Sequence, residues 1–261
     1  FATIILCALL GIDDLKLAAS IGIIGAADGP TAIFVASKFA REYLGPITVA
    51  AYSYMSLVPL VQPPVIRALT TKKERMIRMD YKDVKVSKTV KIVFPIFITI
   101  ISGIMAPISV PLVGLLMFGN LIRECGVLER LSKAAQNELS NIVTILLGIT
   151  IGSTMTADAF LKPTTLLILL AGLAAFIFDT AGGVIFVKIL NIFRKNKINP
   201  MVGAAGISAF PMSSRVIQRI ATKEDPTNFI LMQAVSANVA GQLGSIIAGG
   251  IILSLVPLLV G

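Results

Sequence analysis

The stretch FILMQAVSANVAGQLGSIIAGGIILSLVPLLV, residues 229–260, contains no Lys, Arg, Asp or Glu. A helix that crosses the hydrocarbon core of a bilayer needs about 20 mostly apolar residues, and this stretch is longer than that. Two further stretches are similar: Pro163 to Val187, interrupted by one Asp, and Ile92 to Phe118, which contains several prolines. The sequence therefore predicts an all-α membrane protein that crosses the bilayer several times.

The overall composition agrees with a membrane location. Hydrophobic residues make up 56% of the chain and charged residues only 14%, whereas about a quarter of the residues in soluble domains are charged. The net charge of +9 does not indicate nucleic acid, because the basic residues collect in loops between apolar segments. Residues 67–91 and the group from Lys188 to Lys197 are the main basic loops, and an excess of Lys and Arg marks the cytoplasmic side of a membrane. No His is present, which removes the commonest general base and zinc ligand.

Apolar length divides the chain into candidate membrane segments, and several of them are interrupted. Segment 90–119 contains Pro95, Pro107 and Pro111, so we expect it to break near Ala106 and to return or kink. Segments near residues 21–31 and 199–213 are instead interrupted by small and polar residues. One broken segment in each half of a chain is typical of a transporter built from two inverted repeats. The candidate segments are 1–11, 17–38, 46–66, 90–119, 141–157, 163–187, 199–213 and 229–260.

The first interrupted segment carries an acidic residue within an apolar stretch. Asp28 stands before Gly29 and Pro30, and a carboxylate at the centre of a membrane helix costs about 2.5–3.5 kcal/mol on insertion scales. Asp is also a favoured N-cap and Pro a favoured first helical residue, so capping of a half-helix is the alternative role. Irregular backbone at this depth is tolerated only where it is buried in protein or lines a cavity. Asp28 is therefore a candidate ion-binding residue, and both roles can coexist.

Tyr54 is the second candidate for proton chemistry. It lies in a segment that we expect to end at Pro59, Pro63 and Pro64. In a chain without His, a phenol is a neutral acid that can pass on a proton. The alternative is a buried or interfacial tyrosine that donates a hydrogen bond to a carbonyl.

The second interrupted segment offers oxygen ligands and one cation. Asn199 and Ser208 carry polar oxygens, and the backbone near Gly203 is expected to leave carbonyls free. Hard cations such as Na⁺ take this kind of ligand. Arg215 ends the segment, where its planar fork would hold a carboxylate. A plain arginine flanking the membrane is the alternative for Arg215.

Further polar residues lie in the long apolar stretches. Asn238, Gln242 and Ser245 are spaced to share one helical face, and hydrogen bonding between helices also explains such a stripe. Asp179 is a second intramembrane carboxylate without a local partner in the sequence. We take Asp179, Asn238 and Gln242 as candidate polar lining.

Four longer motifs are spread along the chain: GAADGPT (25–31), AYSYMSLVP (51–59), GNLIRECGV (119–127) and NPMVGAAGISAFPMSSR (199–215). Together they resemble the beta subunit of the sodium-translocating, biotin-dependent decarboxylases, a family with oxaloacetate, methylmalonyl-CoA, glutaconyl-CoA and malonate members. The resemblance covers nearly the whole chain. It implies a single membrane domain over residues 1–261 that lacks an N-terminal part.

The resemblance also implies roles for single residues. Asp28 matches an essential aspartate that binds sodium, and Tyr54 matches a tyrosine proposed to move a proton toward carboxybiotin. Arg215 matches an arginine thought to engage the carboxyl group. Asn199, Gly203 and Ser208 match polar positions associated with sodium, which is the only metal expected.

The expected activity is the decarboxylation of carboxybiotin, coupled to export of Na⁺ and consumption of a proton. The biotin is presented by a partner and is not attached to this chain. The resemblance implies an oligomeric complex with a carboxyltransferase (alpha) subunit, a biotin carrier domain and a small gamma or delta membrane subunit, in the cytoplasmic (inner) membrane of a bacterium or archaeon. No nucleic acid is expected. The residues alone leave one rival function, a sodium- or proton-coupled secondary transporter of an organic anion.

Overall fold

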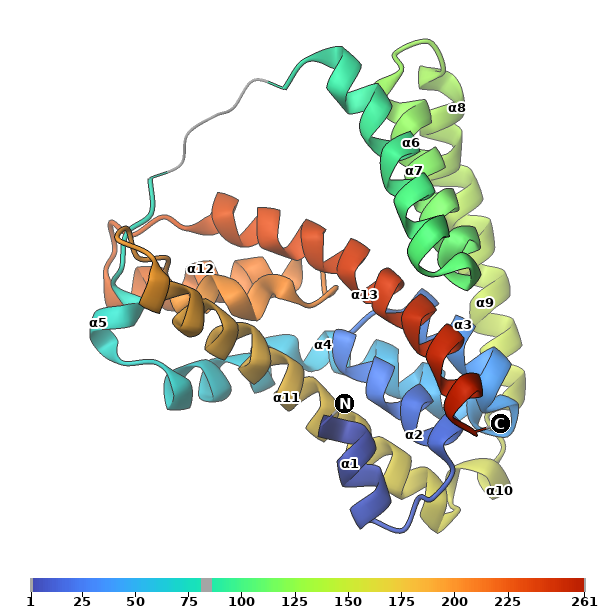
Figure 1. The fold of residues 1–261 in the computed structure, drawn as a ribbon. Coiled ribbons are helices and arrows are strands. Elements are labelled where there is room, and N and C mark those ends of the chain that lie inside the picture. Colours follow the sequence, from blue (N-terminus) through green and yellow to red (C-terminus); the bar gives the residue numbers. More distant parts are fainter. Residues whose placement is uncertain (1, 81–85, 261) are drawn as a thin grey trace. The chain divides into compact units, whose positions relative to one another are not determined.

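A computed structural model of the chain describes residues 2–80 and 86–260, with residues 158 and 159 described in their backbone only. The described residues form helices and connecting turns, with no strand among them, which confirms the all-α class (Figure 1). Within the described ranges, four helices are long and apolar enough to cross a membrane: Arg41–Leu69, Lys88–Met105, Pro163–Phe193 and Leu231–Val260. The first of these ranges includes the short η2 turn before α4.

The chain forms two compact units. The first combines Phe1–Lys82 with Pro163–Ser245, and the second combines Asp83–Lys162 with Ile246–Gly261. Whether they belong to a single membrane domain with inverted repeats stays a prediction. The first unit contains α1 (Ala2–Leu9), α2 (Leu15–Gly22), η1 (Ile23–Ala26), α3 (Gly29–Phe39), η2 (Arg41–Tyr43), α4 (Leu44–Leu69), α5 (Lys72–Arg75), α11 (Pro163–Phe193), η5 (Pro200–Gly206), α12 (Met212–Glu224) and the first half of α13 (Leu231–Val260).

The second unit is built around a helical hairpin. The expected break near Ala106 is confirmed: α6 (Lys88–Met105) ends there, and α7 (Val110–Glu124) follows the short η3 (Pro107–Ser109). Lys91 near the start of α6 pairs with Glu124 at the end of α7, with 3.2 Å between Nζ and Oε2. The chain therefore returns to the side from which it came. The remaining elements are α8 (Glu129–Ala134), the π-helical η4 (Ala135–Leu139), α9 (Ser140–Thr154), α10 (Ala157–Phe160) and the second half of α13.

The prolines of α4 do not end that helix, so the expectation of a stop at Pro59, Pro63 and Pro64 was wrong. The helix continues to Leu69. Val58, Gln62 and Ile66 follow each other at intervals of four residues and are all fully buried. Packing along this face holds the helix together, and prolines are tolerated in membrane helices where neighbouring groups satisfy the freed backbone.

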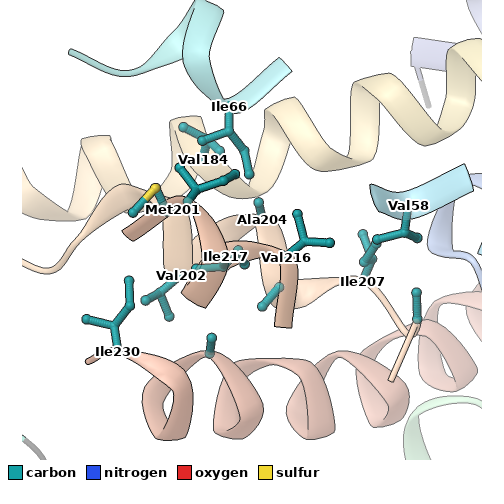
Figure 2. Close-up of a cluster of buried hydrophobic side chains, with 14 of the residues drawn as sticks. Val58, Ile66, Val184, Met201, Val202, Ala204, Ile207, Val216, Ile217 and Ile230 are labelled. Atoms are coloured by element: carbon teal, nitrogen blue, oxygen red, sulfur yellow. The ribbon is translucent and has the colours of Figure 1, made fainter. Parts of the chain in front are cut away.

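The core of the first unit lies where α4, α11, α12 and η5 meet. Figure 2 shows Ile66 of α4 and Val184 of α11 near the side chains of η5, and Val58 of α4 beside Ile207, which follows η5. A short 3₁₀ segment is thus surrounded by apolar side chains rather than by solvent. This core holds the second interrupted segment in place.

The two basic loops meet within the first unit. The Lys188 ammonium lies 3.1 Å from the Glu74 carboxylate and donates a hydrogen bond of 2.9 Å to the Leu69 carbonyl. Both loops therefore lie at the same end of this unit, as their charge predicted. That this end faces the cytoplasm stays a prediction, and residues 81–85 of the predicted loop 67–91 lie outside the described residues.

Candidate ion site at two broken helices

The first break is built by its own sequence. The helix that starts in α2 tightens into η1 and ends at Ala27, whose φ of +51° is left-handed. Asp28 follows in an extended conformation and caps α3, whose first turn contains Pro30. Pro lacks the N–H that a first helical turn does not use. The predicted capping role of Asp28 is confirmed.

The carboxylate of Asp28 accepts hydrogen bonds from three neutral donors. Oδ1 accepts from the Thr31 N–H at 3.3 Å, and Oδ2 accepts from the Thr31 hydroxyl at 2.9 Å. The Ser245 hydroxyl of α13 also donates to Oδ2, at 2.7 Å. The Asp28 side chain is buried. Among the described ion pairs none includes Asp28, so its negative charge has no cationic neighbour to neutralise it.

The second break meets the first through its backbone. Between η5 and α12, the N–H of Ser208 donates to the carbonyl of Ala26 at 2.8 Å. The Ser208 hydroxyl lies 2.5 Å from the hydroxyl of Ser245. Asp28, Ser245 and Ser208 thus form a continuous chain of oxygen atoms across the two breaks.

One face of α13 closes this site. Asn238 donates from its amide nitrogen to the carbonyl of Ile207, while its Oδ1 is buried without a hydrogen-bond partner in the described part of the chain. Gly241 packs against the backbone of Gly206 so closely that a Cβ there would lie 2.1 Å from the Gly206 oxygen. The unused Asn238 oxygen is therefore held beside the second break by contacts that leave no room for a larger residue.

The other predicted lining residues are less closely involved. Gln242 is half-buried, and its backbone carbonyl lies 3.0 Å from the Ser245 hydroxyl, as an alternative acceptor to Asp28. Its side chain has no hydrogen bond among the described residues. Asp179 lies in the middle of α11 with an exposed side chain, and no described contact joins it to Asp28.

Tyr54 does not contact Asp28. It is buried, and its hydroxyl donates to the carbonyl of Leu169 in α11, which is the alternative that the sequence left open. The phenol next to Asp28 is that of Tyr52, whose ring packs on Gly29 so closely that a Cβ there would lie 2.5 Å from the ring carbon Cζ. The role of Tyr54 in proton transfer stays a prediction.

Asn199 and Gly203 make structural contacts away from the Asp28 carboxylate. Asn199 caps η5 by accepting from the Met201 N–H at 3.1 Å, and its amide nitrogen donates to the carbonyls of Arg75 and Ile77, each at 2.9 Å. A Cβ on Gly203 would lie 2.1 Å from the oxygen of Gly183 in α11. Both residues position the second break, and their part in binding sodium stays a prediction.

Arg215 lies in the first turn of α12, just after the second break. Its side chain is exposed and makes no ion pair or hydrogen bond among the described residues. A free guanidinium at this position has all its donors available for a carboxylate.

Sequence reasoning gave too little weight to four residues. Ser245 was noted only as part of a polar stripe, although it bridges the two breaks. Thr31 was signalled by its place three residues after the capping Asp. Tyr52 could not be separated from Tyr54 without structure. Gln62 is fully buried in α4 and donates to the Ala204 carbonyl and the Ser213 hydroxyl, both at 2.9 Å, which ties α4 to both sides of the second break.

The chemistry of this site suits a hard monovalent cation. It offers a carboxylate, hydroxyl groups, an amide oxygen and a break in the backbone, and hard cations prefer oxygen ligands. No group of His, Cys, Asp and Glu that could hold a transition metal occurs among the described residues. The site therefore has the kind of oxygen donors that a cation such as Na⁺ prefers.

Comparisons with known proteins agree with these features. Residues 1–256 match the family described as Na⁺-transporting oxaloacetate decarboxylase beta subunit. The chain is 54% identical to the methylmalonyl-CoA decarboxylase subunit beta of Propionigenium modestum, over 94% of this chain and 62% of that protein. It is also 54% identical to the oxaloacetate decarboxylase beta chain of Haemophilus ducreyi, over 96% of this chain and 58% of that protein.

A third relative, the methylmalonyl-CoA decarboxylase subunit beta of Veillonella parvula, is 52% identical over 91% of this chain and 64% of its own length. The chain thus spans about three fifths of the length of the curated relatives it matches. A family match over nearly every residue, with more than half of the positions identical to these relatives, decides the assignment. The chain belongs to the Na⁺-transporting oxaloacetate decarboxylase beta subunit family.

Proposed function

We propose that this chain is the part of a membrane decarboxylase that binds and translocates Na⁺. The observation that carries the proposal is the buried carboxylate of Asp28, which has only neutral hydrogen-bond donors around it and lies where two broken helices meet. A buried charge without a partner is costly. A bound Na⁺ would supply the missing positive charge.

The hydroxyl groups around Asp28 can change from donors to ligands without moving their oxygens. The Ser245 hydroxyl donates to Asp28, but the Gln242 carbonyl lies 3.0 Å away as a second acceptor. A hydroxyl hydrogen rotates to suit its surroundings. When Na⁺ arrives, the Ser245 hydrogen would turn to the Gln242 carbonyl and leave the oxygen lone pairs free for the cation.

The proposed chemistry follows from the same carboxylate. When carboxybiotin loses carbon dioxide, the bond between the ureido nitrogen and the carboxyl carbon breaks, and its electron pair stays on nitrogen, which then takes a proton. Na⁺ at Asp28 disfavours the protonated form of that carboxylate. In this scheme a proton neutralises Asp28 while the site is empty, and the arriving Na⁺ displaces that proton toward the biotin, with Tyr54 as the predicted relay and Arg215 holding the carboxyl group.

The partners and the membrane are part of this proposal. We place the chain in the cytoplasmic membrane of a bacterium or archaeon, with its basic loops inside. Carboxybiotin would come from a biotin carrier domain that a carboxyltransferase subunit has loaded, and a small gamma or delta subunit would complete the complex. The relatives named above are oxaloacetate and methylmalonyl-CoA decarboxylase subunits, and the acid used by this protein is chosen by the carboxyltransferase.

The test is sodium-dependent release of carbon dioxide from free carboxybiotin by the purified membrane subunits. Asp28→Asn should abolish this activity. Asp179→Asn, which changes another carboxylate in a membrane helix, should keep its dependence on sodium because no described contact links it to the site. Sodium-dependent decarboxylation by the Asp28→Asn variant would contradict the proposal. Uptake of an organic anion by vesicles without any biotinylated partner would instead indicate a secondary transporter.

A further inference from the structure

A cavity of about 630 Å³ lies where the two basic loops of the first unit meet. Its walls come from α5 and from the end of α11 with the loop that follows. The charged residues that line it are Lys73, Glu74, Lys188, Arg194 and Lys197. Figure 1 shows α5 and the end of α11 on the same side of the drawing. Four cations and one carboxylate give this cavity a net positive charge.

The single carboxylate is already neutralised by one of the cations. Glu74 pairs with Lys188 at 3.1 Å and accepts from the Thr71 N–H at 2.7 Å. Although burial by itself would raise the pKa of Glu74, the Thr71 N–H and the Lys188 ammonium lower it below the usual value. Glu74 is therefore ionised at neutral pH, and Lys188 neutralises its charge within the cavity wall.

The other three cations have no such partner. Lys73, Arg194 and Lys197 are exposed and make no ion pair among the described residues. A phosphate diester carries one negative charge and oxygens that Arg and Lys bind well. These three side chains therefore offer charge and donors for one phosphate group.

The apolar rim of the cavity indicates the source of that phosphate. Ile192 lines the cavity, and Ile192 and the adjacent Phe193 are 76% and 83% exposed. They form the last turn of α11, one of the four helices long enough to cross the membrane. A phosphate in the cavity would thus lie at the level of the lipid headgroups, with these side chains extending beside the acyl chains. An acidic protein surface would not pack against these two apolar side chains.

We propose that this cavity binds the headgroup phosphate of an anionic phospholipid such as phosphatidylglycerol. Lys73, Arg194 and Lys197 contact the phosphate oxygens, and Ile192 and Phe193 pack against the acyl chains. Basic pockets beside membrane helices on the cytoplasmic side bind anionic headgroups in this way. The site is separate from Asp28 and does not depend on the proposed transport function.

The experiment measures thermal unfolding of the complete membrane protein in a neutral detergent as lipid is added. The three probes are phosphatidylglycerol, phosphatidylcholine with the same acyl chains, and soluble glycerol 3-phosphate. Phosphatidylglycerol should raise the unfolding temperature at much lower concentration than the other two. Because a basic residue near an anionic membrane surface contributes about a fivefold gain in affinity, the double variant Arg194→Gln, Lys197→Gln should require about 25-fold more phosphatidylglycerol.

Lys195→Gln is the matched control. Lys195 is exposed and lies between the two substituted residues, but it does not line the cavity. It should respond to phosphatidylglycerol like the unchanged protein. An equal loss in this control, or an equal response to phosphatidylcholine, would overturn the proposal. So would a double variant that keeps its lipid response but no longer binds the soluble subunits, since the cavity would then receive an acidic protein surface.

Discussion

Replacing Gly203 with Ala tests whether this residue acts through packing. In the structure, η5 and α11 touch through their backbones: a Cβ on Gly203 would lie 2.1 Å from the Gly183 oxygen and 2.6 Å from its carbonyl carbon. The contact is equally close from the other side: a Cβ on Gly183 would lie 2.2 Å from the Gly203 oxygen. Neither obstacle is the flexible end of a side chain.

The cost follows from that geometry. Non-bonded carbon and oxygen atoms are best separated by about 3.5 Å, so the two segments would have to part by about 1.4 Å. A gap of about 0.5–1 Å already removes about a quarter to a half of the attraction between the atoms on its two sides. Overpacking costs about 1–3 kcal/mol and occasionally more. Since the obstacle is backbone, we expect about 3 kcal/mol for Gly203→Ala, a fall of about 6–12 °C in unfolding temperature.

The assay is thermal unfolding in detergent, followed with a thiol-reactive fluorophore. Cys7 is free and fully buried, so in a background in which every other cysteine of the protein, Cys125 included, is replaced by Ser, it reacts when the fold opens. Gly206→Ala is the matched control in the same segment, because its Cβ would meet nothing within 4 Å. It should unfold within about 2 °C of the unchanged protein, since such a substitution also stiffens the unfolded chain slightly.

Gly183→Ala separates packing from ion binding. It lies in α11 outside the proposed sodium site, but it should destabilise the protein as much as Gly203→Ala does. If Gly183→Ala unfolded at the temperature of the unchanged protein, or if Gly206→Ala fell as far as Gly203→Ala, the packing explanation would be refuted.

Three further predictions concern single contacts. Ser245→Ala should raise the sodium concentration for half-maximal decarboxylation about 10- to 100-fold, because it removes an oxygen proposed to bind the cation, and loss of a group that supports a metal site costs about this factor in affinity. An unchanged sodium requirement would remove Ser245 from the site. Tyr54→Phe should lower the unfolding temperature by only about 1–4 °C, from one lost hydrogen bond to the Leu169 carbonyl, while a collapse of activity with little loss of stability would support the proton relay. The Thr227 hydroxyl and then Arg78 lower the pKa of Asp225 from 3.8 to about 2. The stability that this charge contributes is therefore complete above pH 3.8 and is lost as the pH falls toward 2. Circular dichroism should show that Asp225→Asn removes this part of the acid dependence.

The broken helices were predictable from sequence because residues at or next to each break cause it. Asp28 with Pro30 specifies a helix start within an apolar stretch, and Ala106 among three prolines specifies the turn between α6 and α7. Charge patterning likewise placed the two basic loops at one end. These features depend on neighbours in the chain, which sequence reveals directly.

The contacts between distant segments were not predictable. Ser245 lies 217 positions after the carboxylate to which it donates, and its place on a polar helical face does not reveal which distant group that face meets. The prolines of α4 suggested that the helix stops, because proline disfavours a helix interior. The helix continues past them because its buried face packs against other segments, and those contacts are not visible in the sequence. Tyr52 and Tyr54 differ only in which neighbour each one meets.

The backbone contacts at Gly183, Gly203, Gly206 and Gly241 have a consequence for ion selectivity. Segments that already touch through their main chains cannot move closer together, and the hydrogen bond from Ser208 to Ala26 ties the second break to the first. If Na⁺ binds between these breaks as proposed, the glycine contacts limit how closely the oxygens of Ser208, Asn238 and Ser245 can approach it. Ions of different radius would then be distinguished in part by the main chain and not only by the side chains that bind them.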